Sequence, residues 1–327
     1  MKIWRVHALG GIENLVCDEV PAPVPGPHQV RIRVRATGVN FADSLIIAGK
    51  YQEKPDLPFG PGAEVCGEIV ELGERVEGLR IGERIMALTR HDGYAEEALV
   101  SAALAQPVPP TMSDEAAAGF PIVYGTSHIA LWHKARLQPG ETLVVHGAAG
   151  GVGLTAVEIG KALGARVIAT ASTAEKLEIA KARGADEGIN SREEDLRVRI
   201  KALTDGRGAD VIYDPIGGEV FDASLRAINF EGRILTVGFA GGTVPQIPAN
   251  LLLVKTVDVL GLNWPAYQER RPDILRQSFA ILMDWFADGT LTPLVSKVFD
   301  LDAVPDAIAH VANRKATGKV VVRGTAK

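Results

Sequence analysis

The sequence contains very little cysteine. Only Cys17 and Cys66 occur among its 327 residues, too few for a disulfide framework or for a structural zinc site of four thiolates. Such a composition fits a reducing compartment, and we expect a cytoplasmic protein. No run of seven or more apolar residues follows the charges near the N-terminus, so no secretory signal is expected there.

Long hydrophobic runs and an excess of basic residues are also missing. Nowhere do eighteen apolar residues follow one another without a charge, and we therefore expect no membrane-spanning helix. Lysine and arginine number 35 against 40 aspartates and glutamates, for a net charge of −5. Because nucleic-acid binding depends on clustered basic residues, this charge argues against a nucleic-acid partner.

Length and composition favour two globular domains. Hydrophobic residues make up 46% and charged residues 23%, as in ordinary soluble proteins. Up to about Pro110, short alternating runs broken by glycine and proline predict β-strands and turns. The clearest strands are expected at 30–34, 65–72 and 84–88. The proline-rich segment 21–27 is expected to be an extended connection between elements.

From Ser113, a predicted helix N-cap, the pattern changes to strands that alternate with helices. This alternation predicts a parallel, doubly wound sheet with right-handed crossovers. The expected elements are strands at 142–146, 166–170, 211–213 and 234–237, and helices at 151–163 and 173–183.

The tail of the chain adds helices expected at 273–288 and 302–314 and a strand at 319–322. We assign this tail back to the first domain. The expected domains are therefore 1–121 with 265–327, and 122–264.

A glycine-rich stretch between a predicted strand and a predicted helix is the strongest local signal. It reads His146-Gly147-Ala148-Ala149-Gly150-Gly151-Val152-Gly153. A dinucleotide fingerprint needs a small residue for the turn, a glycine beside the pyrophosphate and a glycine for helix–strand packing. Ala148, Gly150 and Gly153 fill these positions. We expect Ala149, Gly150, Gly151 and Val152 to contact the phosphates at the helix N-terminus.

The choice of cofactor is expected to depend on the end of the second strand of this domain. An acidic residue at the end of that strand would bind the ribose 2′-hydroxyl of NAD, and that acid is missing; Glu175 stands further on, beside Lys176, and is taken as a tolerated neighbour. Ser172, Thr173 and Lys176 stand there instead, two hydroxyls and a cation suited to a 2′-phosphate. The sequence therefore predicts NADPH in preference to NADH.

No metal site is expected. The seven histidines are scattered, and none is spaced from either cysteine as metal ligands usually are. The sequence also lacks a Gly-x-Ser-x-Gly nucleophile elbow and a nucleophilic cysteine motif.

Several motifs together resemble a known family. They are Val39-Asn40-Phe41-Ala42-Asp43, Pro61-Gly62-Ala63-Glu64, Gly93-Tyr94-Ala95-Glu96, the glycine-rich stretch, Ile189-Asn190-Ser191-Arg192-Glu193-Glu194-Asp195, Asp214-Pro215-Ile216-Gly217-Gly218 and Gly318-Lys319-Val320-Val321. The chain resembles the medium-chain dehydrogenase/reductase superfamily, and within it the zinc-free quinone oxidoreductase branch, which includes zeta-crystallin. The resemblance implies an α/β protein with a GroES-like β-rich catalytic domain and a Rossmann domain.

The resemblance also bears on zinc. In the zinc-dependent relatives a cysteine would stand near Asn40 and a histidine where Ala63 precedes Glu64. Both ligands are absent from this sequence. The resemblance therefore implies reduction without zinc, which suits quinones and enones because their developing charge is delocalised.

Site residues follow from the same resemblance. It places Asn40 beside the nicotinamide and the substrate oxygen, and Tyr51 where related enoyl reductases hold a tyrosine proposed as proton donor. Ser191 stands where relatives have a tyrosine that contacts the adenosine phosphate. The remaining cofactor contacts are expected at Thr126, Lys176, Gly238, Phe239, Leu262, Arg314 and Lys319.

The function implied is NADPH-dependent transfer of a hydride to a quinone or an activated double bond. An enoyl-thioester or other enone reductase on the same fold is an alternative. A non-catalytic NADPH-binding protein, like the lens crystallins of this family, is an alternative of another class. We also expect a homodimer, because residues 256–260 alternate like an unprotected edge strand.

Overall fold

A computed structural model of the chain describes residues 1–325 and divides into two compact units. The first unit comprises Met1–Ile122 and Pro293–Lys327, and the second comprises Val123–Thr292. This division matches the expected one near residue 122 and differs for residues 265–292, which lie in the second unit. No helix within residues 1–325 is both long enough and apolar enough to cross a membrane.

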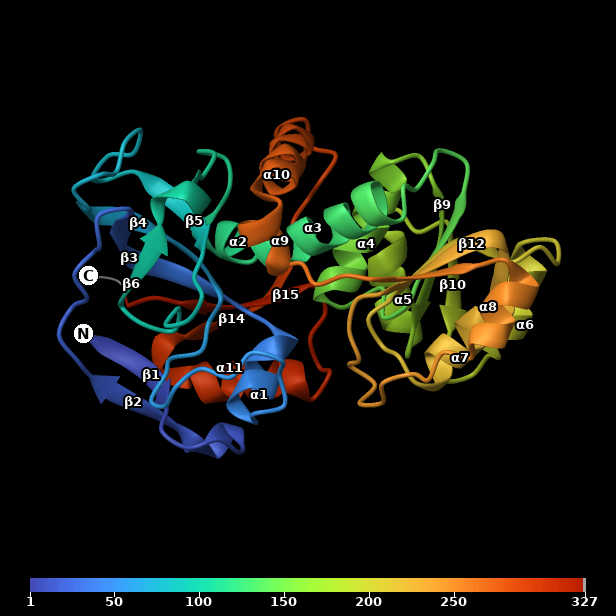
Figure 1. Ribbon diagram of the computed structural model, residues 1–327, viewed down its shortest axis with the longest axis horizontal. Coiled ribbons are helices and arrows are strands. Elements are labelled where there is room, and N and C mark those ends of the chain that lie inside the picture. The colour runs from blue at the N-terminus through green and yellow to red at the C-terminus, as the bar shows by residue number, and fades with distance from the viewer. Residues whose placement is uncertain (326–327) are drawn as a thin grey trace. The chain divides into compact units, whose positions relative to one another are not determined.

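The first unit consists mainly of β-strands (Figure 1). Its seven-stranded sheet has the order β14-β15-β3-β4-β5-β7, with β6 paired to β3, and β1 and β2 form a separate antiparallel pair. The strands are β1 (Lys2–Val6), β2 (Leu15–Glu19), β3 (Gln29–Val39), β4 (Glu64–Leu72), β5 (Arg84–Leu88), β6 (Glu97–Ser101), β7 (Gln106–Pro107), β14 (Val295–Asp300) and β15 (Lys319–Arg323). The helices of this unit are α1 (Phe41–Ile47), α2 (Asp114–Ala118) and α11 (Val304–Ala312), with the short turns η1 (Ile12–Asn14), η2 (Ala102–Leu104) and η4 (Leu301–Ala303).

Strand β3 organises this sheet, because its neighbours include β4, β6 and β15. In its first half Val30, Ile32 and Val34 are buried. The intervening Arg33 and Arg35 are exposed, which is the two-residue alternation of a strand with one solvent-exposed face. From Ala36 to Val39 every residue is buried. The end of β3 is therefore covered on both faces.

The second unit contains a six-stranded sheet whose pairings are all parallel. The strands are β8 (Thr142–Val145), β9 (Arg166–Ala171), β10 (Glu187–Asn190), β11 (Ala209–Asp214), β12 (Ile228–Thr236) and β13 (Asp258–Gly261). The helices are α4 (Gly151–Ala162), α5 (Ala174–Lys181), α6 (Leu196–Leu203), α7 (Glu219–Ala227), α8 (Ala249–Lys255), α9 (Ala266–Arg270) and α10 (Pro272–Ala287), with a π-helical stretch η3 (Ile129–Lys134). Helix α3 (Pro121–His128) crosses the division between the units.

The order of this sheet is β10-β9-β8-β11-β12-β13. Numbered from the first strand of the unit, this is 3-2-1-4-5-6, the arrangement of a Rossmann dinucleotide-binding sheet. The predicted doubly wound sheet is confirmed. Predicted elements differ from the observed ones mostly at their ends, as for the helix expected at 151–163 and observed as Gly151–Ala162.

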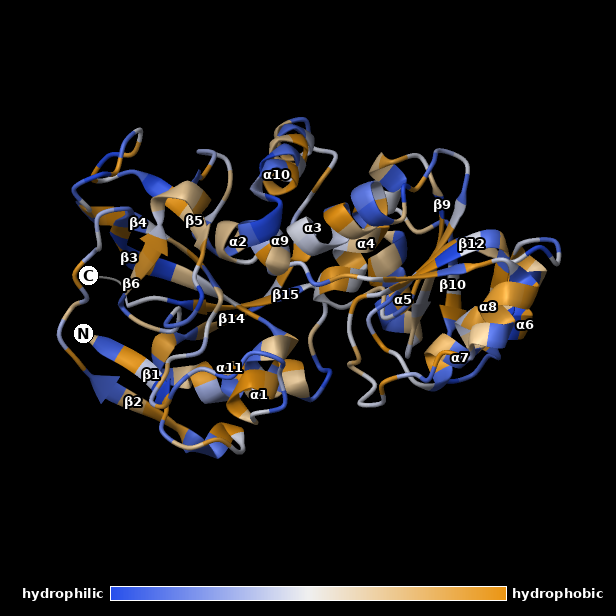
Figure 2. Ribbon diagram, viewed as in Figure 1, coloured by the Kyte–Doolittle hydropathy of each residue, from blue (hydrophilic) through white to orange (hydrophobic). Residues whose placement is uncertain are grey.

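Helix α10 explains why residues 265–292 belong to the second unit. In Figure 2 it carries both hydrophobic and hydrophilic residues, and its buried side chains include Leu275, Phe279 and Leu282. Its Ser278 hydroxyl lies 2.8 Å from Nδ1 of His128, and Trp285 stands edge-on to the same imidazole. The amphipathic pattern predicted the helix, but nothing local in it specified the partner.

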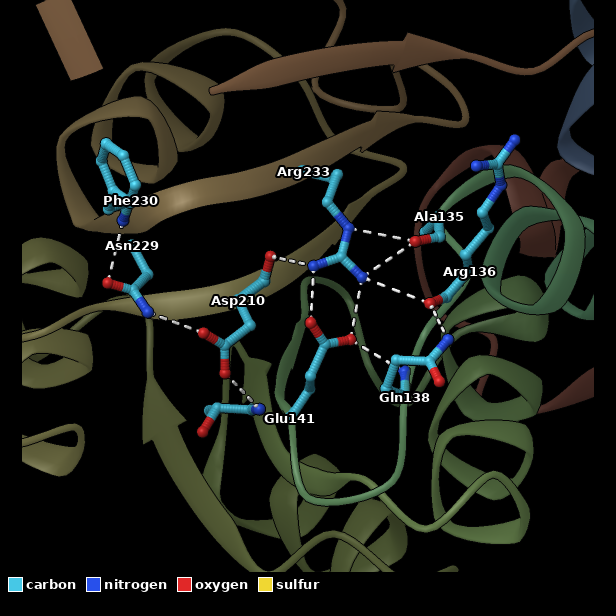
Figure 3. A network of polar contacts seen from close by, with 9 residues as sticks. Ala135, Arg136, Gln138, Glu141, Asp210, Asn229, Phe230 and Arg233 are labelled. Atoms are coloured by element: carbon cyan, nitrogen blue, oxygen red, sulfur yellow. Dashed lines mark hydrogen bonds and ion pairs between the residues drawn. The ribbon is translucent and has the colours of Figure 1, made fainter. Parts of the chain in front are cut away.

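A polar network at the amino-terminal side of the parallel sheet joins the starts of its central strands (Figure 3). The Arg233 guanidinium donates to both carboxylate oxygens of Glu141, at 2.7 and 2.8 Å, and to the Ala135 carbonyl. The Asp210 carboxylate accepts from the Thr142 N–H and from the Asn229 amide. These contacts lie at the edge opposite the glycine-rich loop, and they pair the partly buried polar groups of the strand starts.

Candidate functional site

The cofactor residues predicted for the second unit gather at one edge of the parallel sheet. Parallel strands bring their carboxyl ends to the same edge, where doubly wound folds bind ligands. The glycine-rich loop follows β8, and the predicted contacts after the other strands are Ser172, Thr173 and Lys176 after β9, Ser191 after β10, Gly238 and Phe239 after β12, and Leu262 after β13. The fold thus brings these separate segments together.

The glycine-rich loop makes a tight turn between β8 and α4. Gly147 has φ of 59°, and the Gly150 N–H donates to the Gly147 carbonyl at 2.9 Å. A Cβ added at Gly153 would lie 2.2 Å from the Gly147 oxygen, whereas one at Gly150 would lie 3.3 Å from it. Gly153 therefore permits the helix to pack on the loop, and Gly150 leaves the loop surface without a side chain, as the predicted pyrophosphate contact requires.

These distances predict different effects for two matched alanine substitutions. Gly153→Ala is expected to lower the free energy of unfolding by about 2 kcal/mol, because overpacking against backbone outweighs the gain in helix propensity. Gly150→Ala is expected to leave that free energy within about 1 kcal/mol and to weaken NADPH binding at least tenfold. Urea unfolding and fluorescence titration with NADPH measure the two effects. Equal destabilisation by both substitutions would contradict this division of roles.

The corner after β9 contains the residues predicted to bind a 2′-phosphate. The Thr173 hydroxyl caps α5 by accepting from the Lys176 N–H at 3.3 Å. The Ser191 hydroxyl donates to the Ala171 carbonyl at 3.1 Å, so it ties β10 to the end of β9. Lys176 lies half-buried on the first turn of α5. The corner holds a cation and the positive end of a helix.

Two residues beneath the loop were missed by the sequence analysis as site residues. His146 is fully buried, with Nδ1 2.9 Å from the Thr170 hydroxyl and Nε2 2.8 Å from the Ser224 hydroxyl. Burial lowers the pKa of His146, which favours the neutral ring. Asp214, at the end of β11, accepts from the N–H groups of Ile216 and Gly217. The signal for both was their position at the carboxyl end of a buried strand, His146 directly after β8 and Asp214 as the last residue of β11.

Thr126 lies on α3 and is only 8% exposed. Its neighbour Ser127 donates to the Val152 carbonyl at 2.9 Å, and this bond holds α3 beside the glycine-rich loop. Gly125 has Trp264 against it, since a Cβ there would lie 2.7 Å from the indole. The structure therefore places Thr126 next to the loop within the second unit.

In the first unit, Asn40 belongs to a compact polar cluster. We call Asn40, Glu64 and Lys319 the Asn40 cluster. The Asn40 Nδ2 donates to Glu64 Oε1 at 2.9 Å, and Lys319 Nζ donates to Asn40 Oδ1 at 2.7 Å. Lys319 and Glu64 are also paired, with Nζ and Oε1 2.5 Å apart. Sequence reasoning named Asn40 and Lys319 as site residues and passed over Glu64.

A second buried pair lies beside this cluster. The Tyr94 hydroxyl donates to Asp43 Oδ2 at 2.7 Å, and the Asn40 N–H donates to the same oxygen at 2.8 Å. Burial raises the pKa of Asp43 to about 6, against the opposing effect of these two donors. Burial also raises the pKa of Tyr94 well above its ordinary value. Asp43 therefore anchors the start of α1, and with it the backbone of Asn40.

Tyr51 and Arg314 have different surroundings. Tyr51 is half-buried in the bend after α1, and burial raises the pKa of its hydroxyl, partly offset by a hydrogen bond with the Gln52 side chain. Arg314 is exposed beyond the end of α11 and has a left-handed backbone, with φ of 58°. Arg314 and Lys319 were predicted from one segment, yet only Lys319 is buried.

The predicted absence of zinc ligands concerns the positions near Asn40 and Ala63. Within residues 1–325, no group of three or more histidine, cysteine, aspartate and glutamate side chains is placed to hold a metal ion. Cys66 is buried, with its thiol 3.6 Å from Asp114 Oδ1, and burial raises its pKa.

Comparison with protein families matches both units. Residues 26–110 match the alcohol dehydrogenase GroES-like domain, and residues 151–284 match the domain described as zinc-binding dehydrogenase. The GroES-like and Rossmann architecture predicted from the sequence is thereby confirmed.

Similarity to individual proteins extends over nearly the whole chain. The chain is 44% identical over 321 residues to quinone oxidoreductase-like protein 2 homolog of Nematostella vectensis, and the match covers 94% of this chain and 88% of that protein. The Escherichia coli quinone oxidoreductase complexed with NADPH has a TM-score of 0.92 at 29% identity, with 99% and 100% of the two chains covered. The CurK enoyl reductase has a TM-score of 0.91 at 28% identity, with 99% of each chain covered.

The predicted resemblance is confirmed by these matches. A dinucleotide-type sheet follows a GroES-like unit, and the glycine-rich loop lies at the edge where sheets of this type bind ligands. The protein is thus an oxidoreductase of the medium-chain dehydrogenase/reductase superfamily and belongs to its quinone oxidoreductase branch.

Proposed function

We propose that this protein is an NADPH-dependent reductase of quinones or activated carbon–carbon double bonds that works without zinc. The observation that carries the proposal is the corner after β9, where Lys176 and the N-terminus of α5 stand and the residues directly after the strand are Ser172 and Thr173. The first acid beyond them is Glu175, in the first turn of α5. The glycine-rich loop suits a pyrophosphate, since Gly150 at the start of α4 has no side chain to block an approach to the helix N-terminus. The Escherichia coli quinone oxidoreductase, which carries NADPH, has the same fold.

The roles of the residues follow from their positions. NADPH, when bound, supplies the hydride. Backbone N–H groups at the start of α4 would hold the pyrophosphate, and Lys176 would hold the 2′-phosphate. Asn40 would donate a hydrogen bond to the substrate oxygen, where negative charge develops. The two cysteines fit a reducing compartment, and we propose the cytoplasm.

An enoyl-thioester or other enone reductase is the second candidate. It is favoured by the similarity to the CurK enoyl reductase and by Tyr51, a half-buried phenol in the bend after α1 that is protonated at neutral pH. A protonated phenol is what a proton donor to carbon requires.

The test is a panel of quinones, enones and enoyl thioesters with NADPH, each assayed before and after prolonged chelation. The proposal expects NADPH oxidation with at least one acceptor and equal rates in the two arms, because no metal takes part. Loss of activity on chelation, restored by zinc, would contradict the zinc-free mechanism. Tight NADPH binding without oxidation by any acceptor would favour the non-catalytic alternative.

Cofactor preference provides a sharper test of the proposed role of Lys176. Lys176→Ala is expected to cost about 1.5–3 kcal/mol of NADPH binding, roughly one to two decades in Kd, and to leave NADH binding nearly unchanged. Lys181→Ala on the same helix is the matched control, because Lys181 is exposed and pairs with Glu178. Fluorescence titration with both cofactors measures the effect. An equal rise in the Kd for NADPH and for NADH in Lys176→Ala would show that the lysine does not recognise the 2′-phosphate.

We also propose a homodimer formed along β13. This strand ends the parallel sheet, and within residues 1–325 no strand pairs with its outer edge. Apolar side chains exposed just before it include Val244, Leu253 and Val254, the last two at 80% and 74% exposure. An open edge beside apolar surface favours pairing across a two-fold axis.

Light scattering is expected to give twice the mass of one chain at micromolar concentration. Replacing Leu253 and Val254 by glutamate is expected to shift the protein towards monomer, because the charges would be buried at the interface. Val24→Glu, at an equally exposed valine of the first unit, is the control and should leave the mass unchanged. A monomeric wild-type protein would rule out the proposed assembly.

A further inference from the structure

The Asn40 cluster is brought together by three adjacent strands. Strand β15 pairs with β3 so that Val320 lies opposite Val39, and β4 pairs with β3 so that Val65 lies opposite Thr37. Lys319 precedes Val320 and Glu64 precedes Val65, and both therefore flank the end of β3 where Asn40 begins α1. The register of the sheet therefore determines where Lys319 and Glu64 lie relative to Asn40.

The hydrogen bonds of the cluster determine which way the Asn40 carboxamide faces. A lysine ammonium can only donate, so the Asn40 atom beside Lys319 Nζ is the oxygen Oδ1. A carboxylate can only accept, so the atom beside Glu64 Oε1 is Nδ2. With the amide reversed, the Nδ2 donor would face the Lys319 ammonium, and the Oδ1 acceptor would face the Glu64 carboxylate. The flanking pair therefore fixes the orientation of the amide.

One donor of the Asn40 amide remains available. Nδ2 carries two protons, and one is directed to Glu64. The other has the Gly38 carbonyl at 3.4 Å, which is too long for a strong bond. Asn40 itself is half-buried, whereas Glu64 is fully buried and Lys319 is 6% exposed. Of these three residues, the amide is the most accessible to a ligand.

The surrounding backbone is shaped to admit this pair. A Cβ at Gly38 would lie 2.5 Å from Glu64 Oε1 and equally close to the Ala118 carbonyl, and one at Gly119 would lie 2.5 Å from Lys319 Cγ. The second oxygen of Glu64 accepts from the Ile122 N–H at 2.8 Å. A buried ion pair is usually no more stabilising than apolar side chains of similar volume. The stability of the fold alone therefore does not explain the Lys319–Glu64 ion pair.

We propose that Lys319 is a positioning residue that acts through Asn40. With Glu64 it holds the carboxamide in one orientation, so that the second N–H of Nδ2, which has only the long contact with the Gly38 carbonyl, is presented to the oxygen of the bound quinone or enone. This inference rests on the proposed function and changes the expected role of Lys319, which the sequence suggested as a cofactor contact. Preorganised donors aimed at developing charge are a major source of catalysis.

The test is a double-mutant cycle with Lys319→Met, Asn40→Ala and the two combined. Lys319→Met is expected to lower kcat about tenfold while KM for the acceptor and Kd for NADPH change less than twofold. The same substitution added to Asn40→Ala is expected to cost nothing further, because the amide that it positions is gone. Lys2→Met, which removes an exposed ion pair of the same unit, is the matched control.

Two outcomes of the cycle would overturn the proposal. A tenfold loss from Lys319→Met also in the Asn40→Ala protein would show that Lys319 acts independently of the amide. A rise of tenfold or more in the Kd for NADPH would make Lys319 a cofactor contact. If Lys319→Met fails to fold, Lys319→Met combined with Glu64→Gln removes the unpaired charge. Restoration of wild-type kcat in this neutral pair would equally refute positioning.

A measurement without substrate separates this inference from the proposed function. In ¹⁵N-labelled protein the Asn40 carboxamide signals are identified by their loss in Asn40→Ala. Lys319→Met is expected to shift these signals and to speed their hydrogen exchange at least tenfold, and Lys2→Met should not. Unchanged signals would overturn the positioning role whatever the acceptor panel shows. Shifted signals without turnover would support the positioning and count against the reductase.

Discussion

Replacing Tyr51 by phenylalanine is expected to lower the reduction of enones and enoyl thioesters by about 10²–10⁴-fold and to spare the reduction of quinones. Reduction of an enone leaves an enolate that must be protonated on carbon, and a positioned general acid speeds that step. Reduction of a quinone leaves an aromatic oxyanion, which water can protonate after release. Tyr51 is half-buried, and its phenol is protonated at neutral pH, as a general acid must be.

Steady-state rates with one quinone and one enone, together with the Kd for NADPH, measure this effect. Tyr267→Phe is the matched control, because Tyr267 is also partly buried and lies in the second unit against His133. Equal losses on both acceptors would mean that Tyr51 shapes the binding site. Unchanged rates on both would leave Tyr51 a packing residue.

Replacing Glu158 by leucine is expected to lower the free energy of unfolding by about 3–5 kcal/mol, the usual cost of removing one partner from a buried ion pair. Glu158 lies on α4 and is 5% exposed. Its Oε1 accepts from Arg183 at 3.0 Å and from the Thr292 hydroxyl at 3.1 Å, and its Oε2 accepts from the Tyr124 hydroxyl at 2.5 Å. The substitution removes the carboxylate to which Arg183, Thr292 and Tyr124 donate, and Arg183 retains its hydrogen bonds to Thr292.

Urea unfolding at neutral pH measures this loss. Glu178→Leu is the matched control, because Glu178 is exposed on α5 and its ion pair with Lys181 lies at the surface. Surface pairs of this kind contribute little, and the control is expected to stay within about 0.5 kcal/mol of the wild type. Similar losses in the two variants would show that the buried cluster does not stabilise the second unit.

Much of the fold could be predicted because its signals are local. The alternation of Val30, Ile32 and Val34 predicted a strand, and β3 contains it. Ser113 predicted a helix start, and its hydroxyl accepts from the Ala116 N–H. The glycine-rich stretch predicted a strand–loop–helix unit, which β8 and α4 form.

The assignment of residues 265–292 to the first domain was wrong where the signal was not local. The amphipathic pattern of α10 specifies that one face is buried but not which unit buries it. Ser278 forms a hydrogen bond with His128, which lies 150 positions away in the chain, and the periodicity of hydrophobic residues cannot predict such a contact. Domain membership of this helix was decided by packing.

By itself, the sequence determined the strand and helix periods, the glycine-rich loop and the hydroxyls directly after β9, since each depends on residues within a few positions of one another. Only the tertiary structure decided that Lys319 would reach Asn40, which lies 279 positions away, and that Glu64 would join them. Sheet register brings the ends of β3, β4 and β15 together, and burial then requires their charged and polar groups to find partners. Pairing of this kind arises only on folding, because in the extended chain water satisfies each group separately.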